Sequence, residues 1–134
     1  MLLGDDRDRM IVDPFEKECG VPVLNLAGKT SLPEVASILD GALALVCHDS
    51  GLMHIGNAVG VPLVALYGPT DLNFTRPMAS TSCIIRNEQL ACIGCMKNFS
   101  KTEAEALRDC PIQVQCMRLI LVNEVFDLVQ RVRR

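Results

Sequence analysis

Apolar residues along this chain gather in short runs that end at small or polar residues. Three of these runs, 21–26, 43–47 and 63–67, are rich in Val, Leu and Ala. An apolar run without alternation is typical of a strand buried on both faces, as in a parallel sheet. The pattern therefore predicts strands at these positions.

Amphipathic segments separate the predicted strands. Ser31 resembles a helix N-cap, because Glu34 follows three residues later and Pro33 lies early in the segment. The next helix is predicted at 51–59, where Gly60 and Pro62 stop it. Strand, helix and strand in succession predict βαβ units and a parallel sheet with flanking helices, a Rossmann-like α/β fold.

The two ends of the chain complete this outline. Leu2–Gly4 reads as the tail of a strand, followed by a helix start at Asp5–Arg9, and Ser82–Arg86 reads as a short strand. Residues 90–117 form an irregular, cysteine-rich loop. An amphipathic helix is predicted at about 118–132, with apolar positions at Ile120, Leu121, Val125, Leu128, Val129 and Val132. The size of the chain predicts one domain over 1–134.

Composition and charge exclude several classes of function. The net charge of −3 and the lack of a basic stripe argue against nucleic-acid binding, and the basic end Arg131–Arg134 suits the C-terminus of a helix. No apolar stretch is long enough to span a membrane, and the acidic opening is unlike a signal peptide. A reducing compartment follows, in which the seven cysteines are thiols or metal ligands rather than disulfides.

The segment His48-Asp49-Ser50-Gly51-Leu52-Met53-His54 carries the candidate chemistry. It places a strand end directly before a helix N-terminus, where backbone amides bind anions. Gly51 leaves room for an anion to approach, and His54, in the first turn, is expected to stay neutral and donate a hydrogen bond. Ordinary helix capping by Asp49 or Ser50 is the simpler alternative.

Two further loops follow predicted strands, namely 27–30 and 68–71. In a parallel sheet, loops at the carboxyl ends of the strands line the ligand crevice. The three loops are therefore predicted to converge on one binding site.

The segments Asn25–Leu32, Asp49–His54, Gly60–Pro62 and Leu66–Asp71 together resemble the C-terminal half of the lipopolysaccharide heptosyltransferases, glycosyltransferase family 9. The resemblance implies half of a GT-B fold, truncated at its start, in which a nucleotide sugar such as ADP-heptose binds. It also implies that Asp49, Ser50, Gly51 and His54 contact the sugar diphosphate. By the same resemblance, Gly28, Lys29 and Thr30 lie near the nucleotide, and Thr70 and Asp71 lie near the sugar.

The chain departs from the family pattern in two ways. Leu72 stands where family members often have Pro. The upstream lysine loop and the acceptor domain with its catalytic Asp are not in this sequence, so no catalytic residue is assigned. The acceptor, a lipid A-core sugar, is expected only in a full-length enzyme, and no cofactor is required.

Four cysteines in the 90–117 loop form a pattern of their own. Cys92 and Cys95 make a C-x-x-C pair, and Cys110 and Cys116 follow at loop spacing. Four thiolates can hold a tetrahedral structural zinc, and unligated thiols are the alternative. Cys19, Cys47 and Cys83 are expected to be small core residues.

The sequence thus predicts the nucleotide-sugar-binding part of a lipopolysaccharide-core glycosyltransferase, inactive alone. A non-catalytic remnant or interaction module of the same fold is the alternative. A cytoplasmic location, with or without peripheral contact to the inner membrane, follows from the resemblance. The C-terminal helix is expected to leave its apolar face uncovered and to make a homo-oligomer, unless it folds back onto its own domain.

Overall fold

The computed structural model describes residues 1–96, 105 and 108–134, and it divides into two compact units. Unit 1 comprises Met1–Ile38 and unit 2 comprises Leu39–Arg134. Each unit is described by itself below, and the single domain over 1–134 stays a prediction.

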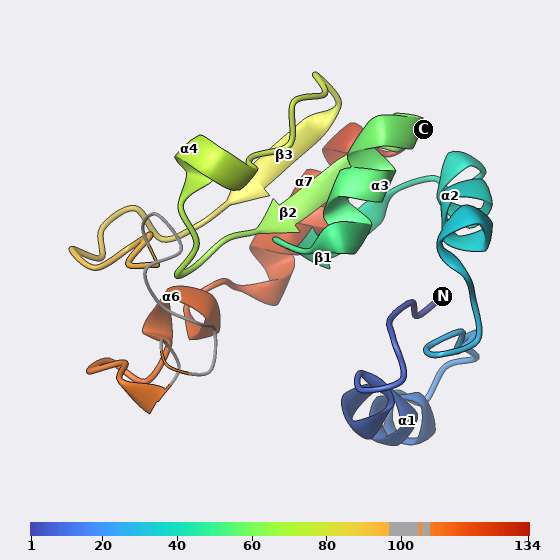
Figure 1. The fold of residues 1–134 in the computed structure, drawn as a ribbon, viewed down its shortest axis with the longest axis horizontal. Coiled ribbons are helices and arrows are strands. Elements are labelled where there is room, and N and C mark those ends of the chain that lie inside the picture. Colours follow the sequence, from blue (N-terminus) through green and yellow to red (C-terminus); the bar gives the residue numbers. More distant parts are fainter. Residues whose placement is uncertain (97–104, 106–107) are drawn as a thin grey trace. The chain divides into compact units, whose positions relative to one another are not determined.

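Unit 1 pairs the two apolar segments predicted as strands, over a shorter length than expected. Leu2 donates its amide to the carbonyl of Leu24 at 2.8 Å and accepts from the amide of Leu26 at 2.9 Å. Only a single parallel bridge, Leu2 with Asn25, is assigned among the described residues. The helix α1 (Arg9–Glu18) follows the first of these segments (Figure 1).

Asn25 is the buried polar residue of unit 1. Its amide nitrogen donates to Asp13 at 2.9 Å and to Glu16 at 2.8 Å, both on α1, and its oxygen accepts from the amide of Ala27 at 3.1 Å. Because every polar atom of the buried amide has a partner, burial carries little cost and fixes α1 to this segment.

The helix α2 (Leu32–Asp40) begins as the sequence predicts. The Glu34 carboxylate accepts from the Ser31 amide at 2.8 Å and from the Ser31 hydroxyl at 2.7 Å. These bonds lower the pKa of Glu34. The bond from the amide satisfies an N–H group ahead of the first turn.

Unit 2 is built on a parallel sheet with the strand order β1-β2-β3. The strands are β1 (Leu45–His48), β2 (Leu63–Leu66) and β3 (Ser82–Ile85). Leu63 of β2 aligns with Leu45 on one side and with Ser82 on the other. Leu63, Val64 and Ala65 of the central strand are fully buried, which agrees with an apolar run without alternation.

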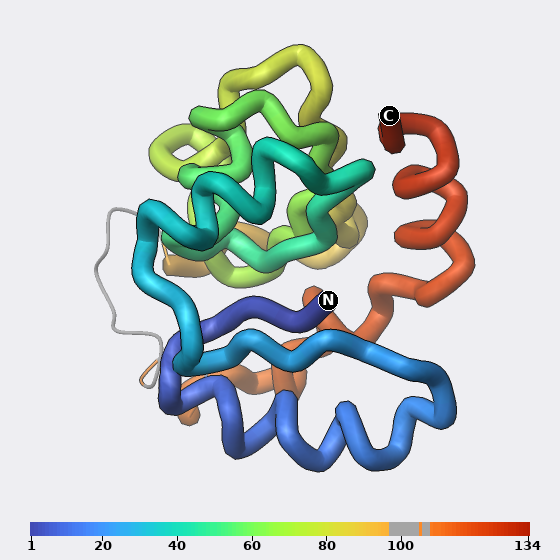
Figure 2. Tube along the Cα trace, turned by 90° about the vertical axis from the view of Figure 1, so that its right-hand side faces the viewer, coloured from blue at the N-terminus to red at the C-terminus, as the bar shows by residue number. Residues whose placement is uncertain are grey.

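The helices α3 (Gly51–Val59) and α7 (Val122–Val132) cover opposite faces of this sheet (Figures 1 and 2). On one face, Leu45, Cys47 and Ala65 pack into a core with Met53 of α3. The alternate residues of the strands face α7, where Val46 and Leu66 line an apolar groove with this helix. This alternation is the ordinary consequence of the strand repeat, and the parallel α/β fold with flanking helices is confirmed.

Two short helices lie outside the predicted elements. The helix α4 (Leu72–Thr75) follows the predicted loop 68–71, in a segment for which the sequence predicts no element. The helix α6 (Gln115–Arg118) lies at the end of the predicted 90–117 loop. The helix expected at about 118–132 is α7, which begins at Val122 after Leu119–Leu121. Part of the predicted cysteine-rich loop, 97–104 and 106–107, lies outside the described residues.

The expectation that the C-terminal helix leaves its apolar face uncovered is wrong. The helix α7 packs against β2 and β3 of its own unit, with Val125, Leu128 and Val129 partly buried. At its end, Arg134 donates to the carbonyls of Asp40 at 2.6 Å and Gly60 at 3.2 Å. The sheet itself therefore provides the cover that a second copy was expected to provide, and a homo-oligomer stays a prediction.

Within the described ranges, every helix is too short or too polar to cross a bilayer.

Candidate functional site

The turn from β1 into α3 has the geometry expected of an anion site. The strand ends at His48 and the helix begins at Gly51, with Ser50 as an extended N-cap residue at φ −155° and ψ 171°. The Ser50 carbonyl accepts from the amides of Met53 at 3.1 Å and His54 at 3.4 Å. The amides before these have no carbonyl to reach within the helix, as at any helix start.

Gly51 leaves this helix start open. Its backbone angle φ lies outside the left-handed region, and a Cβ built on it would meet no atom within 4 Å among the described residues. Ser50 is exposed and its side chain makes no capping bond in the described part of the chain. The hydroxyl and the first amides of α3 are thus accessible to a ligand.

His54 is exposed on the first turn of the same helix. It lies four residues after Ser50, so the two side chains share a helix face. That the His54 side chain donates a hydrogen bond to a ligand stays a prediction.

Asp49 has a partner that the sequence did not indicate. Its Oδ2 accepts from the Thr75 hydroxyl at 2.6 Å, and Thr75 is the last residue of α4. The Tyr67 hydroxyl donates to the Thr75 carbonyl at 2.8 Å. Asp49 thus joins the end of β1 to α4, and it acts here as a fixed part of the scaffold.

Burial next to this carboxylate suppresses ionisation of two neighbouring groups. Burial, with Asp49 as the next cause, raises the pKa of the Cys47 thiol to about 12. Burial also raises the pKa of the Tyr67 hydroxyl to about 12, although the bond to Thr75 opposes this. Both groups are therefore neutral at physiological pH.

Thr70 and Asp71 lie in the loop after β2, and both are partly buried. The Asp71 Oδ1 accepts from the backbone amide of Asn73 at 3.0 Å and from its side chain at 2.9 Å. Asp71 is therefore the N-cap of α4. Because Asp49 binds Thr75 at the other end of α4, the loops after β1 and β2 are brought together as predicted.

The third predicted loop belongs to unit 1. Gly28 has φ +69° and donates to the Gly4 carbonyl at 3.0 Å. Lys29 donates to the Asn25 carbonyl at 3.0 Å, and the Thr30 hydroxyl is buried with no hydrogen-bond partner among the described residues. The lysine ammonium is thus turned back onto its own loop.

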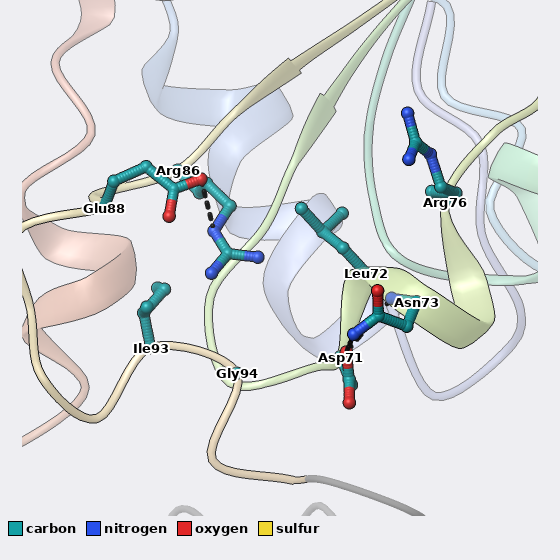
Figure 3. A pocket seen from close by; sticks show the side chains of 8 residues that line it. All are labelled: Asp71, Leu72, Asn73, Arg76, Arg86, Glu88, Ile93 and Gly94. Carbon is teal, nitrogen blue, oxygen red and sulfur yellow. Dashed lines mark hydrogen bonds and ion pairs between the residues drawn. The ribbon is translucent and has the colours of Figure 1, made fainter.

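A polar cavity of about 530 Å³ beside α4 was not predicted (Figure 3). Its polar side chains include Arg86 and Glu88, which follow β3, and Arg76, which follows α4. The sequence signal was weak, because isolated charged residues after a strand are common. Only the strand order brings them beside Asp71.

Two of the cysteine-bearing segments of the predicted zinc site lie near Gly68. The Gly68 carbonyl accepts from the amide of Gly94, between Cys92 and Cys95, at 3.1 Å, and a Cβ on Gly68 would lie 3.0 Å from the Cys116 sulfur. All seven cysteines are free thiols. In the described part of the chain no group of three or more His, Cys, Asp or Glu side chains is placed to hold a metal, and the zinc site stays a prediction.

Comparison with known proteins places this chain in a family. The model of glycosyltransferase family 9 (heptosyltransferase) matches residues 1–107 of the 134 in the chain. The chain belongs to glycosyltransferase family 9. The matched range of this family 9 chain includes both loops joined by Asp49 and the open start of α3.

Curated relatives carry the same family name. Lipooligosaccharide heptosyltransferase 2 of Haemophilus influenzae is 51% identical over 84 residues, which cover 63% of this chain and 23% of the relative. Lipopolysaccharide heptosyltransferase 2 of Escherichia coli is 45% identical over 62 residues, covering 46% of this chain and 18% of the relative. The family 9 chain therefore spans about a quarter or less of these relatives.

Solved structures agree on the fold. The structure of E. coli ADP-heptose lps heptosyltransferase II matches with a TM-score of 0.58 and 34% identity, over 64% of this chain and 27% of that one. A family 9 glycosyltransferase from Veillonella parvula matches with a TM-score of 0.75 over 97% of this chain and 35% of that one. At 23% identity the second likeness concerns the fold alone.

Proposed function

We propose that this chain is the nucleotide-sugar-binding part of a heptosyltransferase of lipopolysaccharide core biosynthesis, with the start of α3 as its diphosphate site. The observation that carries the proposal is the open helix start at Gly51, directly after the carboxyl end of β1. Membership of family 9 supports an ADP-heptose-like donor and a GT-B context.

The chemistry of the site suits a diphosphate. The first amides of α3 and the positive end of its dipole attract an anion. The Ser50 hydroxyl and the His54 ring can each donate a hydrogen bond from the exposed side of this turn. In the transfer reaction the leaving diphosphate gains negative charge, and these fixed donors would stabilise that charge.

The other predicted residues have supporting roles in the proposal. Asp49 positions the turn through Thr75, and Asp71 positions α4 as its N-cap. Lys29 would have to exchange its bond to the Asn25 carbonyl for a phosphate oxygen of the nucleotide. Gly28, Thr30 and Thr70 would line the nucleotide and sugar ends of the donor.

The proposal assigns glycosyl transfer itself to groups other than these donor-binding residues. An inverting transfer needs a base that removes the proton from the acceptor hydroxyl. None of the donors at the α3 start is placed as such a base, and the chain spans 23% of its H. influenzae relative. We therefore expect donor binding by this chain and no glycosyl transfer to a lipid A-core acceptor.

The test is to titrate the parent chain and the Gly51→Val variant with ADP. Amide chemical shifts monitor binding in both titrations. The valine side chain enters open space, so the fold should persist while the approach of an anion is blocked. We expect an affinity of about 1 mM for the parent and no detectable binding for the variant.

Ala58→Val is the matched control, because Ala58 is exposed near the other end of the same helix. It should bind ADP as the parent does. Equal binding by Gly51→Val would place the nucleotide elsewhere, and a folded parent without ADP binding would favour a non-catalytic interaction module.

A further inference from the structure

The cavity beside α4 in unit 2 has walls from three segments that are distant in sequence. Its volume is about 530 Å³, within the range of small-molecule sites. The α4 region provides Asp71, Leu72, Asn73 and Arg76, the segment after β3 provides Arg86 and Glu88, and the loop beyond provides Ile93 and Gly94.

Arg86 is the cation inside this cavity. Its side chain is 14% exposed, and in Figure 3 the guanidinium lies between Leu72 and Ile93. Its Nε lies 3.0 Å from a Glu88 oxygen, yet this buried nitrogen makes no well-aligned hydrogen bond. A guanidinium has five N–H donors, and no partner for the terminal nitrogens is found among the described residues.

The acids of the cavity only partly compensate this charge. Glu88 is 69% exposed, so its carboxylate can turn to solvent at little cost. Asp71 is engaged with Asn73. Arg76, also exposed, has no carboxylate partner in the described part of the chain. The cavity is thus lined by two cations and two acids, of which only Glu88 lies within ion-pair distance of Arg86 among the described residues.

An oxyanion would complete the bonds of Arg86, because guanidinium groups bind carboxylates and phosphates through two parallel hydrogen bonds. The remaining polar groups, the free oxygen of Asp71 and the Asn73 amide, suit hydroxyl groups, which both donate and accept. Leu72 and Ile93 offer apolar surface for the carbon face of a ring.

We propose that this cavity is a binding site for an acidic sugar, a polyhydroxyl ring that carries one phosphate or carboxylate, with Arg86 as the residue that binds the anionic group. The site is separate from the open start of α3, since Gly51, Ser50 and His54 do not line it. The proposal rests on the proposed function only in taking a sugar as the body of the ligand.

The experiment titrates the chain with glucose 6-phosphate, glucuronate, glucose and inorganic phosphate, and follows amide chemical shifts. We expect one of the two acidic sugars to bind, with the larger shifts at Asn73, Arg86 and Gly94. Binding of glucose 6-phosphate identifies a phosphate ligand, and binding of glucuronate identifies a carboxylate ligand. Glucose or phosphate that binds as tightly as both acidic sugars would overturn the proposal.

Two variants with opposite expected effects on affinity distinguish a loss of binding from a loss of folding. Arg86→Gln should lower the affinity for the acidic sugar by about tenfold or more. Glu88→Gln should raise this affinity severalfold, because it removes the carboxylate that competes with the ligand for Arg86. Since a folding defect cannot strengthen binding, an unchanged or weaker affinity in Glu88→Gln overturns the proposal even where Arg86→Gln is unstable.

Arg108→Gln is the matched control. Arg108 also has its Nε 3.0 Å from a carboxylate, that of Asp109, but it is 71% exposed and does not line this cavity. Its loss should leave the affinity unchanged. Gly51→Val should abolish ADP binding and spare the acidic sugar, so failure of one site is distinguishable from failure of the other.

Discussion

The sequence predicts Asp49 as a ligand-binding residue, whereas in the structure its side chain connects two elements of the fold. Its position before a helix start suggests a cap or a phosphate site, whereas its carboxylate binds the Thr75 hydroxyl. The partner is 26 residues away, so no local pattern indicates it. The bond positions α4, which borders the cavity that holds Arg86.

Thr75→Val should lower the free energy of unfolding by about 1–2 kcal/mol. The substitution keeps the shape and removes the hydroxyl, so a half-buried carboxylate loses a charged hydrogen bond, and solvent limits the cost. Urea denaturation measures the effect. Thr81→Val, at an exposed position, should change stability by less than about 0.5 kcal/mol, and equal losses in the two variants would contradict this role of Thr75.

Tyr67 should make the fold sensitive to alkali. Its pKa is raised from 10.0 to about 12, so between these values the unfolded chain loses the phenol proton and the folded chain keeps it. Stability is therefore fully present below pH 10 and decreases as pH rises toward 12, by up to about 1.4 kcal/mol per pH unit.

Tyr67→Phe should reduce this alkaline slope while costing about 1 kcal/mol at neutral pH, where the bond to the Thr75 carbonyl is lost. Urea midpoints at several pH values measure both effects. A slope unchanged by the substitution would show that other groups, such as Cys47, account for the loss.

Among the secondary-structure elements, the helices and strands that are marked by residues within or next to them were predictable. The helix at Gly51–Val59 was predicted with its observed bounds, because a glycine at each end and a buried strand on each side mark it. The helix α4 was missed because it is short and is held by Asp71, Tyr67 and Asp49 rather than by its own residues.

The site was predictable to the same extent. The turn at 49–51 could be found from its own pattern. Its approach to the loop after β2 followed from the parallel sheet, whereas the bond to Thr75 had no local signal. The cavity around Arg86 could not, since it depends on the order of β2 and β3 and on the approach of Gly94 to Gly68. Contacts of this kind are tertiary, and a single sequence does not contain their distances.

Two glycines of α3 should respond oppositely to alanine. A Cβ on Gly56 would lie 2.6 Å from Leu45 Cδ2 and 3.1 Å from Val61 Cγ1, so Gly56→Ala should lower stability by about 1–2 kcal/mol despite the better helix propensity. Gly51→Ala meets open space and should raise stability by up to about 1 kcal/mol. Thermal unfolding of both variants checks the signs, and a stabilising Gly56→Ala would contradict the close packing of α3 on β1.

On the scale of the whole molecule, the two units differ in how much they bury. Unit 2 has a central strand with Leu63, Val64 and Ala65 at 0% exposure. The helix α1 of unit 1, by contrast, has no buried residue and leaves Met10 85% and Ile11 75% exposed. Segments with few buried apolar contacts open more readily than the core of a protein.

Amides of unit 1 should therefore exchange with solvent faster than those of β2. Hydrogen exchange followed by mass spectrometry should show the slowest exchange in peptides covering Leu63–Leu66 and faster exchange in α1. The loop residues 68–71 serve as an internal comparison within unit 2. Equal protection of α1 and β2 would show that the units unfold as one.

The position of Tyr67 has an optical consequence. The chain has one tyrosine and no tryptophan, so this single buried ring provides nearly all of its near-ultraviolet absorption and intrinsic fluorescence. Because the ring touches Met53 and Thr75, its emission reports the state of unit 2 alone, whereas far-ultraviolet circular dichroism reports helices of both units. Fluorescence and dichroism thus follow different parts of this molecule, without any introduced label.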